Sequence, residues 1–293
     1  MKKITVVGAG TMGNGIAHVF GLHDYQVNLV DLSAKQLERA MATISHNLNR
    51  MVEKKKITTD AKVKALVNIQ TSTKLPPSIE NADLVIEAVI ENEPLKLKVF
   101  EDLNTYAPQT CILASNTSSI SISKLASCVD ARERVIGMHF MNPVPLMKLV
   151  EIVKGYDTSD GVCDAVERLT KVIGKVPVVV NDYPGFVSNR ILMPMINEAI
   201  YTLYEGVAEV QGIDQIMRLG LAHPMGPLQL ADFIGLDVCL SILDVLYEGF
   251  GHSKYAPCPL LVNMVHAGRL GRKSGEGFYQ YGQGKTAVSD NFQ

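Results

Sequence analysis

The stretch ITVVGAGTMGNGIAHVF (residues 4–20) constrains the fold of this chain more than any other segment. A run of β-branched residues leads into Gly8-x-Gly10-x-x-Gly13, and an apolar periodicity typical of a helix follows. Glycines at this spacing are common by chance, but between a strand and a helix they have a physical role. Gly8 allows a tight turn, Gly10 lets the backbone approach a pyrophosphate, and Gly13 lets the helix pack closely.

The helix that follows these glycines predicts the rest of a dinucleotide site. Its first residues, Thr11 and Met12, present backbone N–H groups and a positive dipole end, both of which favour phosphate. The next strand-like run, QVNLVD, ends in Asp31, where a carboxylate can accept hydrogen bonds from ribose hydroxyls. That carboxylate would repel a ribose phosphate, so NAD is favoured over NADP, with Lys35 as the nearest cation. The competing interpretation is an ordinary strand–helix turn in which Asp31 caps the next helix.

Strand-like and helix-like segments alternate along the first 180 or so residues. The helix-like segments cover 11–23, 33–56, 94–106 and 158–173. Runs rich in Val and Ile predict strands at 4–8, 26–31, 67–70, 83–89, 111–115, 134–140, 147–153 and 176–181. This alternation predicts an α/β fold, a Rossmann-type doubly wound parallel sheet with helices on both faces.

After Asn181 the strand-like runs stop and a long helical periodicity begins, so we expect a domain boundary near 181–184. Residues 1–182 would form the NAD-binding domain, and 183–293 an all-helical C-terminal domain for substrate binding and dimerisation. Its surplus of Leu, Ile, Met and Tyr predicts a homodimer surface. The polar tail GQGKTAVSDNFQ is expected to fray.

Composition narrows the function classes. A hydrophobic fraction of 47% and a charged fraction of 20% are those of a globular protein, and a net charge of −2 argues against a nucleic-acid partner. The five cysteines are never spaced as CxxC, so we expect neither disulfides nor a metal site. No segment approaches the ~20 apolar residues of a membrane span, and no signal peptide is recognisable, so we expect a cytoplasmic protein without a membrane partner.

Two ionisable residues stand in apolar strands. His139 ends the run RVIGMHF, and Glu151 lies within MKLVEIV, with the turn NPVP between the two runs. Since an unpaired buried charge is costly, the two residues are natural partners. A histidine held by a carboxylate on one nitrogen has the other free to act as a base. A hydrogen-bonded core histidine explains the same pattern.

A polar cluster, Ser115-Asn116-Thr117-Ser118-Ser119, follows the predicted strand CILAS. One or two of these side chains could cap the next helix. Five in a row exceed that need, so we expect hydrogen bonds to a ligand at this carboxyl strand end. The same edge of the sheet would carry His139, which favours catalysis over core packing.

Six segments together resemble the L-3-hydroxyacyl-CoA dehydrogenase family, most closely its short bacterial 3-hydroxybutyryl-CoA members. They are GAGTMGNGIA, ASNTSS, GMHFMNPVPLMKLVEIV, DYPGFVSNRIL, HPMGPLQLADFIGLD and GRKSGEGFY. The resemblance implies that His139 is the base and that Glu151 orients it. It also implies that Ser118 and Asn189 bind the substrate oxygens, with Asn142 supporting the same site.

Further residues match family positions that contact ligands. Glu91, Lys96 and Lys273 match positions at the NAD site, with Ser118 and Asn142 beside them. Arg50 and Lys54 correspond to basic positions near the nucleotide of an acyl-CoA substrate, and a solvated charged face explains them almost as well. Met141 departs from the family, in which many members carry an aromatic residue there. A flexible thioether could alter the acyl pocket, so the chain-length preference stays open.

Two other functions fit part of these observations. A 3-hydroxyacid dehydrogenase acting on a free acid would share the two-domain plan, but such enzymes typically carry a lysine where this chain has Asn189. A catalytically silent, NADH-binding structural or regulatory relative would not need both His139 and Glu151. The sequence therefore favours an NAD-dependent oxidoreductase for a short 3-hydroxyacyl-CoA.

Overall fold

The computed structural model describes residues 1–282 and 285–292, and the chain divides into two compact units. The first unit is Met1–Tyr183, and the second is Pro184–Gln293. Each unit has its own cluster of buried apolar side chains. The two units are described separately.

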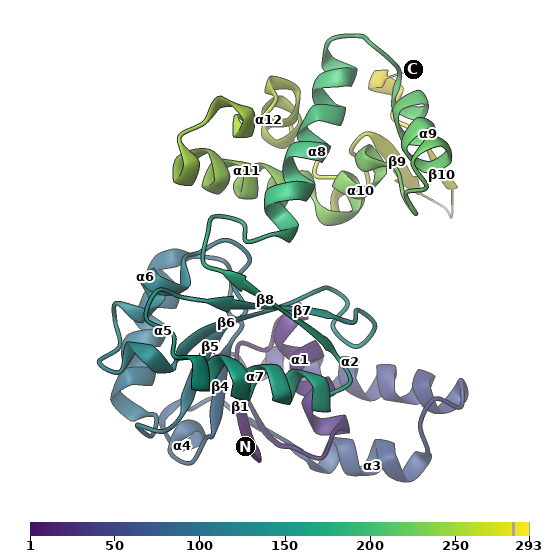
Figure 1. Cartoon of the computed structure of the whole chain (residues 1–293). Helices are drawn as coiled ribbons and strands as arrows, with labels where there is room; N and C mark the ends of the chain where they lie inside the picture. Colours follow the sequence, from purple (N-terminus) through teal and green to yellow (C-terminus); the bar gives the residue numbers. More distant parts are fainter. Residues whose placement is uncertain (283–284, 293) are drawn as a thin grey trace. The chain divides into compact units, whose positions relative to one another are not determined.

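The first unit is built on an eight-stranded sheet with the strand order β3-β2-β1-β4-β5-β6-β7-β8 (Figure 1). All eight predicted strands are present. They are β1 Lys3–Val7, β2 Gln26–Val30, β3 Ile69–Ser72, β4 Leu84–Glu87, β5 Ile112–Ser115, β6 Val135–Phe140, β7 Leu149–Lys154 and β8 Val176–Asn181. The order reverses at β1, beside β4, which is where doubly wound sheets bind their ligands.

One strand pair differs from the predicted parallel sheet. Strands β6 and β7 run antiparallel, while all the other neighbouring pairs are parallel. Residues 141–148 join the two strands without a helix, and parallel neighbours need a crossover of a dozen or more residues. The sheet is therefore mixed, and its one antiparallel pair includes β6, the strand that carries His139.

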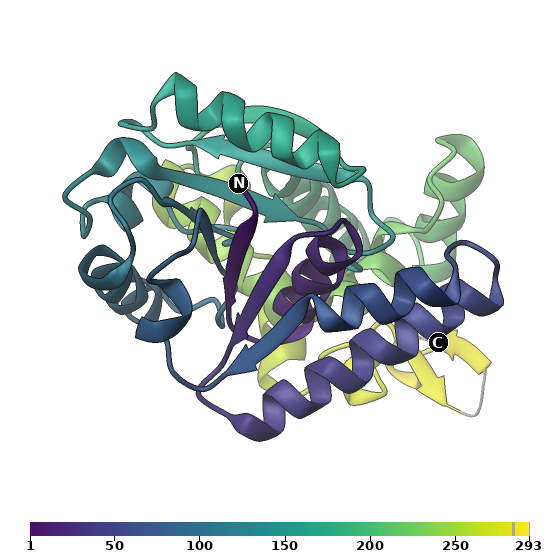
Figure 2. The same ribbon diagram turned by 90° about the horizontal axis from the view of Figure 1, so that it is seen from below.

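Helices cover both faces of the sheet. The core on one face includes residues of α1 (Thr11–Leu22), α2 (Ala34–Glu53) and α7 (Asp160–Val172). The other face is covered by α5 (Glu93–Tyr106) and α6 (Ile122–Ala126). Figure 2 shows α2, with α3 (Thr59–Val67), on the opposite side of the strands from α5 and α6. A short helix, α4 (Pro76–Ile79), precedes β4.

Among its described residues, the second unit consists of helices and one pair of strands. Its helices are α8 Ser188–Tyr204, α9 Val210–Gly220, α10 Pro227–Ile234, α11 Leu236–Phe250 and α12 Pro259–His266. Strands β9 (Tyr279–Gly282) and β10 (Lys285–Val288) pair antiparallel, so the unit is not all-helical.

The expectation of a frayed tail is wrong for the part of 282–293 that the structure describes. Buried Asp232 on α10 accepts hydrogen bonds from the backbone N–H groups of Phe278 (3.0 Å) and Tyr279 (2.9 Å). Beyond β10, Ser289 is fully buried and donates its hydroxyl to Glu276. The tail is therefore held by the pairing of β10 with β9 and by Ser289, neither of which its polar composition predicts.

No helix among the described residues is both long and apolar enough to cross a membrane. The cytoplasmic location stays a prediction.

Candidate active site

The glycine loop has the geometry that a dinucleotide requires. Gly8 has φ of +102°, and a Cβ there would lie 2.6 Å from the carbonyl oxygen of Ala88. A Cβ on Gly13 would lie 1.7 Å from the carbonyl oxygen of Gly8, so the close approach joins α1 mainly to the loop. Nothing lies within 4 Å of a Cβ on Gly10, the N-cap of α1. The helix N-terminus at Thr11 is thus open to a pyrophosphate, and these residues fit the predicted cofactor.

Asp31 shapes the same loop. Its carboxylate accepts hydrogen bonds from the backbone N–H groups of Ala9 (2.8 Å) and Ser33 (2.9 Å). The N-cap of α2 is Ser33, whose hydroxyl accepts from the backbone N–H of Gln36. The interpretation of Asp31 as that cap is therefore wrong. Its contact with ribose stays a prediction, and its position beside the glycine loop suits it.

His139 and Glu151 lie directly opposite each other on β6 and β7. The imidazole Nδ1 is 2.8 Å from a carboxylate oxygen of Glu151, and Nε2 is 3.0 Å from the hydroxyl oxygen of Ser118. The two residues are 6% and 2% exposed. An ionised carboxylate can only accept hydrogen bonds, so a Glu151 carboxylate requires a proton on Nδ1 of His139. Nε2 is then able to accept a proton.

The polar cluster that begins at the last residue of β5 forms mostly hydrogen bonds within the protein, whereas the sequence predicted hydrogen bonds to a ligand. The hydroxyls of Thr117 and Ser119 donate to Glu91, and that of Ser115 donates to Glu87. The side-chain oxygen of Asn116 accepts from the backbone N–H of Phe140, which ties β5 to β6. The α6 cap is Ser121, outside the cluster. Of the five residues, Ser118 is the one whose hydroxyl reaches His139.

A buried ion pair lies under this cluster. Lys96, 1% exposed, places its ammonium 2.6 Å from Glu87, which is fully buried, and 3.3 Å from Glu91. Burial by itself raises the pKa of Glu91, but Lys96 and hydrogen bonds from the 117–119 turn outweigh it, and the net pKa is lowered. Glu91 is therefore a carboxylate at neutral pH. Lys96 holds two carboxylates in place, and its direct contact with NAD stays a prediction.

Glu87 is a residue that the sequence analysis missed. It stands in DLVIEAV just as Glu151 stands in MKLVEIV, a single carboxylate in a buried strand. The signal was therefore available. Glu87 also accepts the backbone N–H of Val89 at 2.7 Å, so it fixes the turn that leads from β4 to Glu91.

Two neighbouring cavities lie between α1, α2 and the 141–148 connection. One, of about 320 Å³, is lined by Thr11, Asn142 and residues of α2. The other, of about 430 Å³, is lined by Arg50 and Lys54, among others. They share Asn47, Pro143 and Pro145 as wall residues. The structure thus brings the two predicted CoA-binding cations to a cavity adjacent to the one behind the glycine loop.

Two predicted site residues belong to the second unit. Asn189 is 8% exposed and lies in the first turn of α8. Lys273 is partly exposed and forms an ion pair with Asp237 at 2.5 Å. Their roles at the substrate and at NAD stay predictions.

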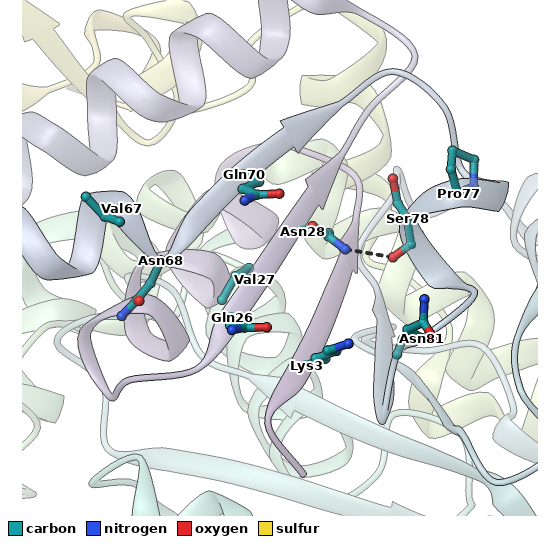
Figure 3. Close-up of a pocket in the computed structure, with 11 residues that line it drawn as sticks. Lys3, Gln26, Val27, Asn28, Val67, Asn68, Gln70, Pro77, Ser78 and Asn81 are labelled. Carbon is teal, nitrogen blue, oxygen red and sulfur yellow. Dashed lines mark hydrogen bonds between the residues drawn. The ribbon is translucent and has the colours of Figure 1, made fainter.

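A third cavity of the first unit is shown in Figure 3. It is lined by Lys3, Gln26 and Asn68, at the amino-terminal ends of β1, β2 and β3, and by Asn28, whose amide donates to the carbonyl oxygen of Ser78 at 2.9 Å. The glycine loop follows the carboxyl-terminal end of β1, and His139 lies at the carboxyl-terminal end of β6. This cavity is therefore not part of the site.

Comparison with known proteins identifies the family of the chain. The family model "3-hydroxyacyl-CoA dehydrogenase, NAD binding domain" matches residues 3–183, and the model of the C-terminal domain of 3-hydroxyacyl-CoA dehydrogenase matches residues 185–281. The 3-hydroxybutyryl-CoA dehydrogenase of Bradyrhizobium diazoefficiens is 55% identical over 281 residues, 96% of each chain. That of Clostridioides difficile is 46% identical, covering 95% of this chain and 99% of the relative.

A solved structure gives the same result. The crystal structure of (S)-3-hydroxybutyryl-CoA dehydrogenase from Ralstonia eutropha superimposes with a TM-score of 0.94 at 47% identity. It covers 97% of this chain and 100% of that one. With both family models matched in order, the chain belongs to the 3-hydroxyacyl-CoA dehydrogenase family, and its first unit is the NAD-binding domain of that family.

Proposed function

We propose that this protein interconverts L-3-hydroxybutyryl-CoA and acetoacetyl-CoA with NAD, using His139 as general base. The observation that carries the proposal is the row Ser118–His139–Glu151, with contacts of 3.0 and 2.8 Å, in which His139 and Glu151 are buried. The names of relatives 46–55% identical to this chain support the substrate.

Glu151 fixes the ring of His139 and stabilises its charged form once Nε2 accepts a proton. Nε2 takes that proton from the 3-hydroxyl of the substrate. The hydroxyl of Ser118 lies within hydrogen-bond distance of Nε2, so it can hold the substrate oxygen at the same point. In this proposal Asn189 donates to a substrate oxygen as well.

When NAD is bound, it accepts the hydride from C3 of the substrate. Gly8, Gly10 and Gly13 would let the loop approach its pyrophosphate, and Asp31 would accept hydrogen bonds from its ribose hydroxyls. Glu91, kept ionised by Lys96, borders the site beside Ser118. Asn142 and Lys273 complete the cofactor contacts in this proposal.

The cavity of about 430 Å³, which we call the cationic cavity, supports an acyl-CoA substrate. Arg50 and Lys54 line it together, on one end of α2, and their charges suit the phosphates of the CoA nucleotide. The apolar wall contributed by Pro143 and Pro145 suits the uncharged arm that follows.

We also propose a homodimer formed through the second unit. Helix α9 leaves Ile216 62% exposed and Leu219 81% exposed, and Leu221 follows at 61%. Apolar side chains gathered in this way mark an association surface. Leu219→Lys should shift the mass measured by light scattering toward the monomer, and an unchanged mass would exclude α9 from the interface.

The function is tested with a panel of 3-ketoacyl-CoA chain lengths, each with NADH and with NADPH. We expect the highest kcat/KM with acetoacetyl-CoA and NADH. Free acetoacetate, run alongside, should be a poor substrate, and a preference for it would assign the chain to the free-acid dehydrogenases. NADH binding without any turnover would instead indicate a catalytically silent relative.

A further inference from the structure

His18 is a buried histidine that the proposed chemistry does not use. It lies in the middle of α1, is 1% exposed, and neither ring nitrogen has a hydrogen-bond partner among the described residues. Buried polar side chains nearly always have such partners, because an unmade hydrogen bond costs about 1–3 kcal/mol. The ring could therefore donate one hydrogen bond and accept another, and it makes neither.

The ring forms part of the wall of the cationic cavity. Arg50, Lys54 and Lys56 provide three positive charges there, and Asn47 provides an amide. The remaining lining residues are apolar, namely Met51, Pro143, Pro145 and Leu146. The cavity therefore combines cations that suit phosphate with an apolar wall and two uncharged polar side chains, those of Asn47 and His18.

His18 remains neutral in this position. Burial, followed by the nearby charges of Lys175 and His23, lowers its pKa to about 4. Lys175 is itself held by the carbonyl oxygens of Val144 and Met147, on the connection that walls the cavity. A neutral imidazole offers one N–H donor and one acceptor, which matches an amide or a hydroxyl group better than a phosphate.

We infer that His18 is a specificity-determining residue for the uncharged pantetheine arm of the CoA substrate, whose phosphates are held by Arg50, Lys54 and Lys56. The inference rests on the proposed function for the identity of the ligand. The pantetheine arm carries amides and a hydroxyl between methylene and methyl groups, the same mixture that the wall presents. Both ring nitrogens are covered in the present structure, so the ring turns toward the cavity when the arm enters.

The test compares His18→Leu, which removes both polar atoms, with His18→Gln, which keeps a donor and an acceptor. KM and kcat are measured with acetoacetyl-CoA and with the acetoacetyl thioester of N-acetylcysteamine, which lacks most of the arm and all phosphates. His23→Leu is the matched control at the C-cap of the same helix, because the His23 ring is hydrogen-bonded to the carbonyl oxygen of Val19 and is not part of the cavity wall.

We expect His18→Leu to raise KM for acetoacetyl-CoA by about 3- to 10-fold, the effect of one lost hydrogen bond, with little change in kcat. His18→Gln should restore KM, and the short thioester should not distinguish the variants. Equal changes with both thioesters, or none with acetoacetyl-CoA, would overturn the inference.

Calorimetry with free CoA separates this inference from the proposed function. We expect weaker CoA binding by His18→Leu than by wild type or His23→Leu, whether or not acetoacetyl-CoA is reduced. Unreactive wild-type protein that still shows this difference would reject the function and keep the site. Identical CoA affinities in all the variants would reject the site alone.

Discussion

Three side chains on three neighbouring strand ends have different tasks at the site. His139 offers one nitrogen to Glu151 and the other to Ser118, so each polar atom of the ring has a fixed partner. The row continues from Ser118, whose backbone N–H donates to Glu91 at 2.9 Å, to the ammonium of Lys96.

Replacing the base tests the residue at the centre of this row. His139→Gln should lower kcat for acetoacetyl-CoA reduction by roughly 10²- to 10⁴-fold, the usual cost of losing a general acid–base group, with little change in KM. Steady-state kinetics with NADH measure both constants. His46→Gln, an exposed histidine on α2, is the control. Turnover close to wild type in His139→Gln would mean that another group moves the proton.

At the scale of elements, the glycine loop and α1 depend on each other. Gly13 approaches the loop so closely that any side chain must displace Gly8, whereas Gly10 faces open space with an ordinary φ of −67°. The two glycines therefore differ in what an added methyl group would disturb, although the sequence motif treats them alike.

Alanine at each position should separate folding from cofactor binding. We expect Gly13→Ala to lower both the thermal midpoint and the affinity for NADH. Gly10→Ala should leave the midpoint nearly unchanged and weaken NADH binding only, since its Cβ would point to where the pyrophosphate lies. Calorimetric melts and NADH titrations measure the two quantities. Unaltered NADH affinity in Gly10→Ala would contradict this position for the pyrophosphate.

Helix α5 is tied to the sheet by its buried lysine. Lys96→Met should cost roughly 3–5 kcal/mol of unfolding free energy, because it leaves Glu87 buried without its cation. The control is Lys98→Met on the same helix, an exposed residue that pairs with Asp102 and whose loss should change little. Urea unfolding measures the free energy of unfolding of both variants. Equal decreases would show that the buried pair contributes no more stability than the exposed one.

At the scale of the whole molecule, each unit contains carboxylates far from water. In the second unit, Asp232 holds the hairpin through Phe278 and Tyr279. Burial raises the pKa of Asp232 to about 6, despite these hydrogen bonds and one from Tyr281, and the charge of Asp214 adds to the rise. The protonated form is thus favoured in the folded chain more than in the unfolded one.

This shift gives a pH dependence with a definite sign. The folded state binds more protons between pH 3.8 and about 6, so the contribution of Asp232 to stability is complete below that window and is lost as the pH rises through it. Thermal midpoints from pH 3.5 to 7 should therefore fall less with rising pH in Asp232→Asn than in wild type. A steeper fall in the variant would contradict the raised pKa.

Local patterns predicted most of the fold, because Val- and Ile-rich runs and helical periodicity depend on near neighbours in the sequence. The pairing of His139 with Glu151 was also predicted, since a lone carboxylate in a buried strand requires a partner. The pairing of β9 with β10 was missed because β9 is supported by Asp232, on a distant helix, which accepts a hydrogen bond from Tyr279. The tasks of Ser115 and Thr117 were missed because their partners, Glu87 and Glu91, precede them by a whole helix.

The antiparallel pairing of β6 and β7 restricts how this part of the chain can vary in length. Side chains alternate between the two faces of a strand, so a shift of β7 by one residue along β6 would move Glu151 to the opposite face from His139. Insertions and deletions in 141–148 are therefore tolerated only where the extra or missing residue is absorbed in the loop. Among descendants of such a chain, this connection should therefore keep its length as closely as it keeps the residues that line the two cavities.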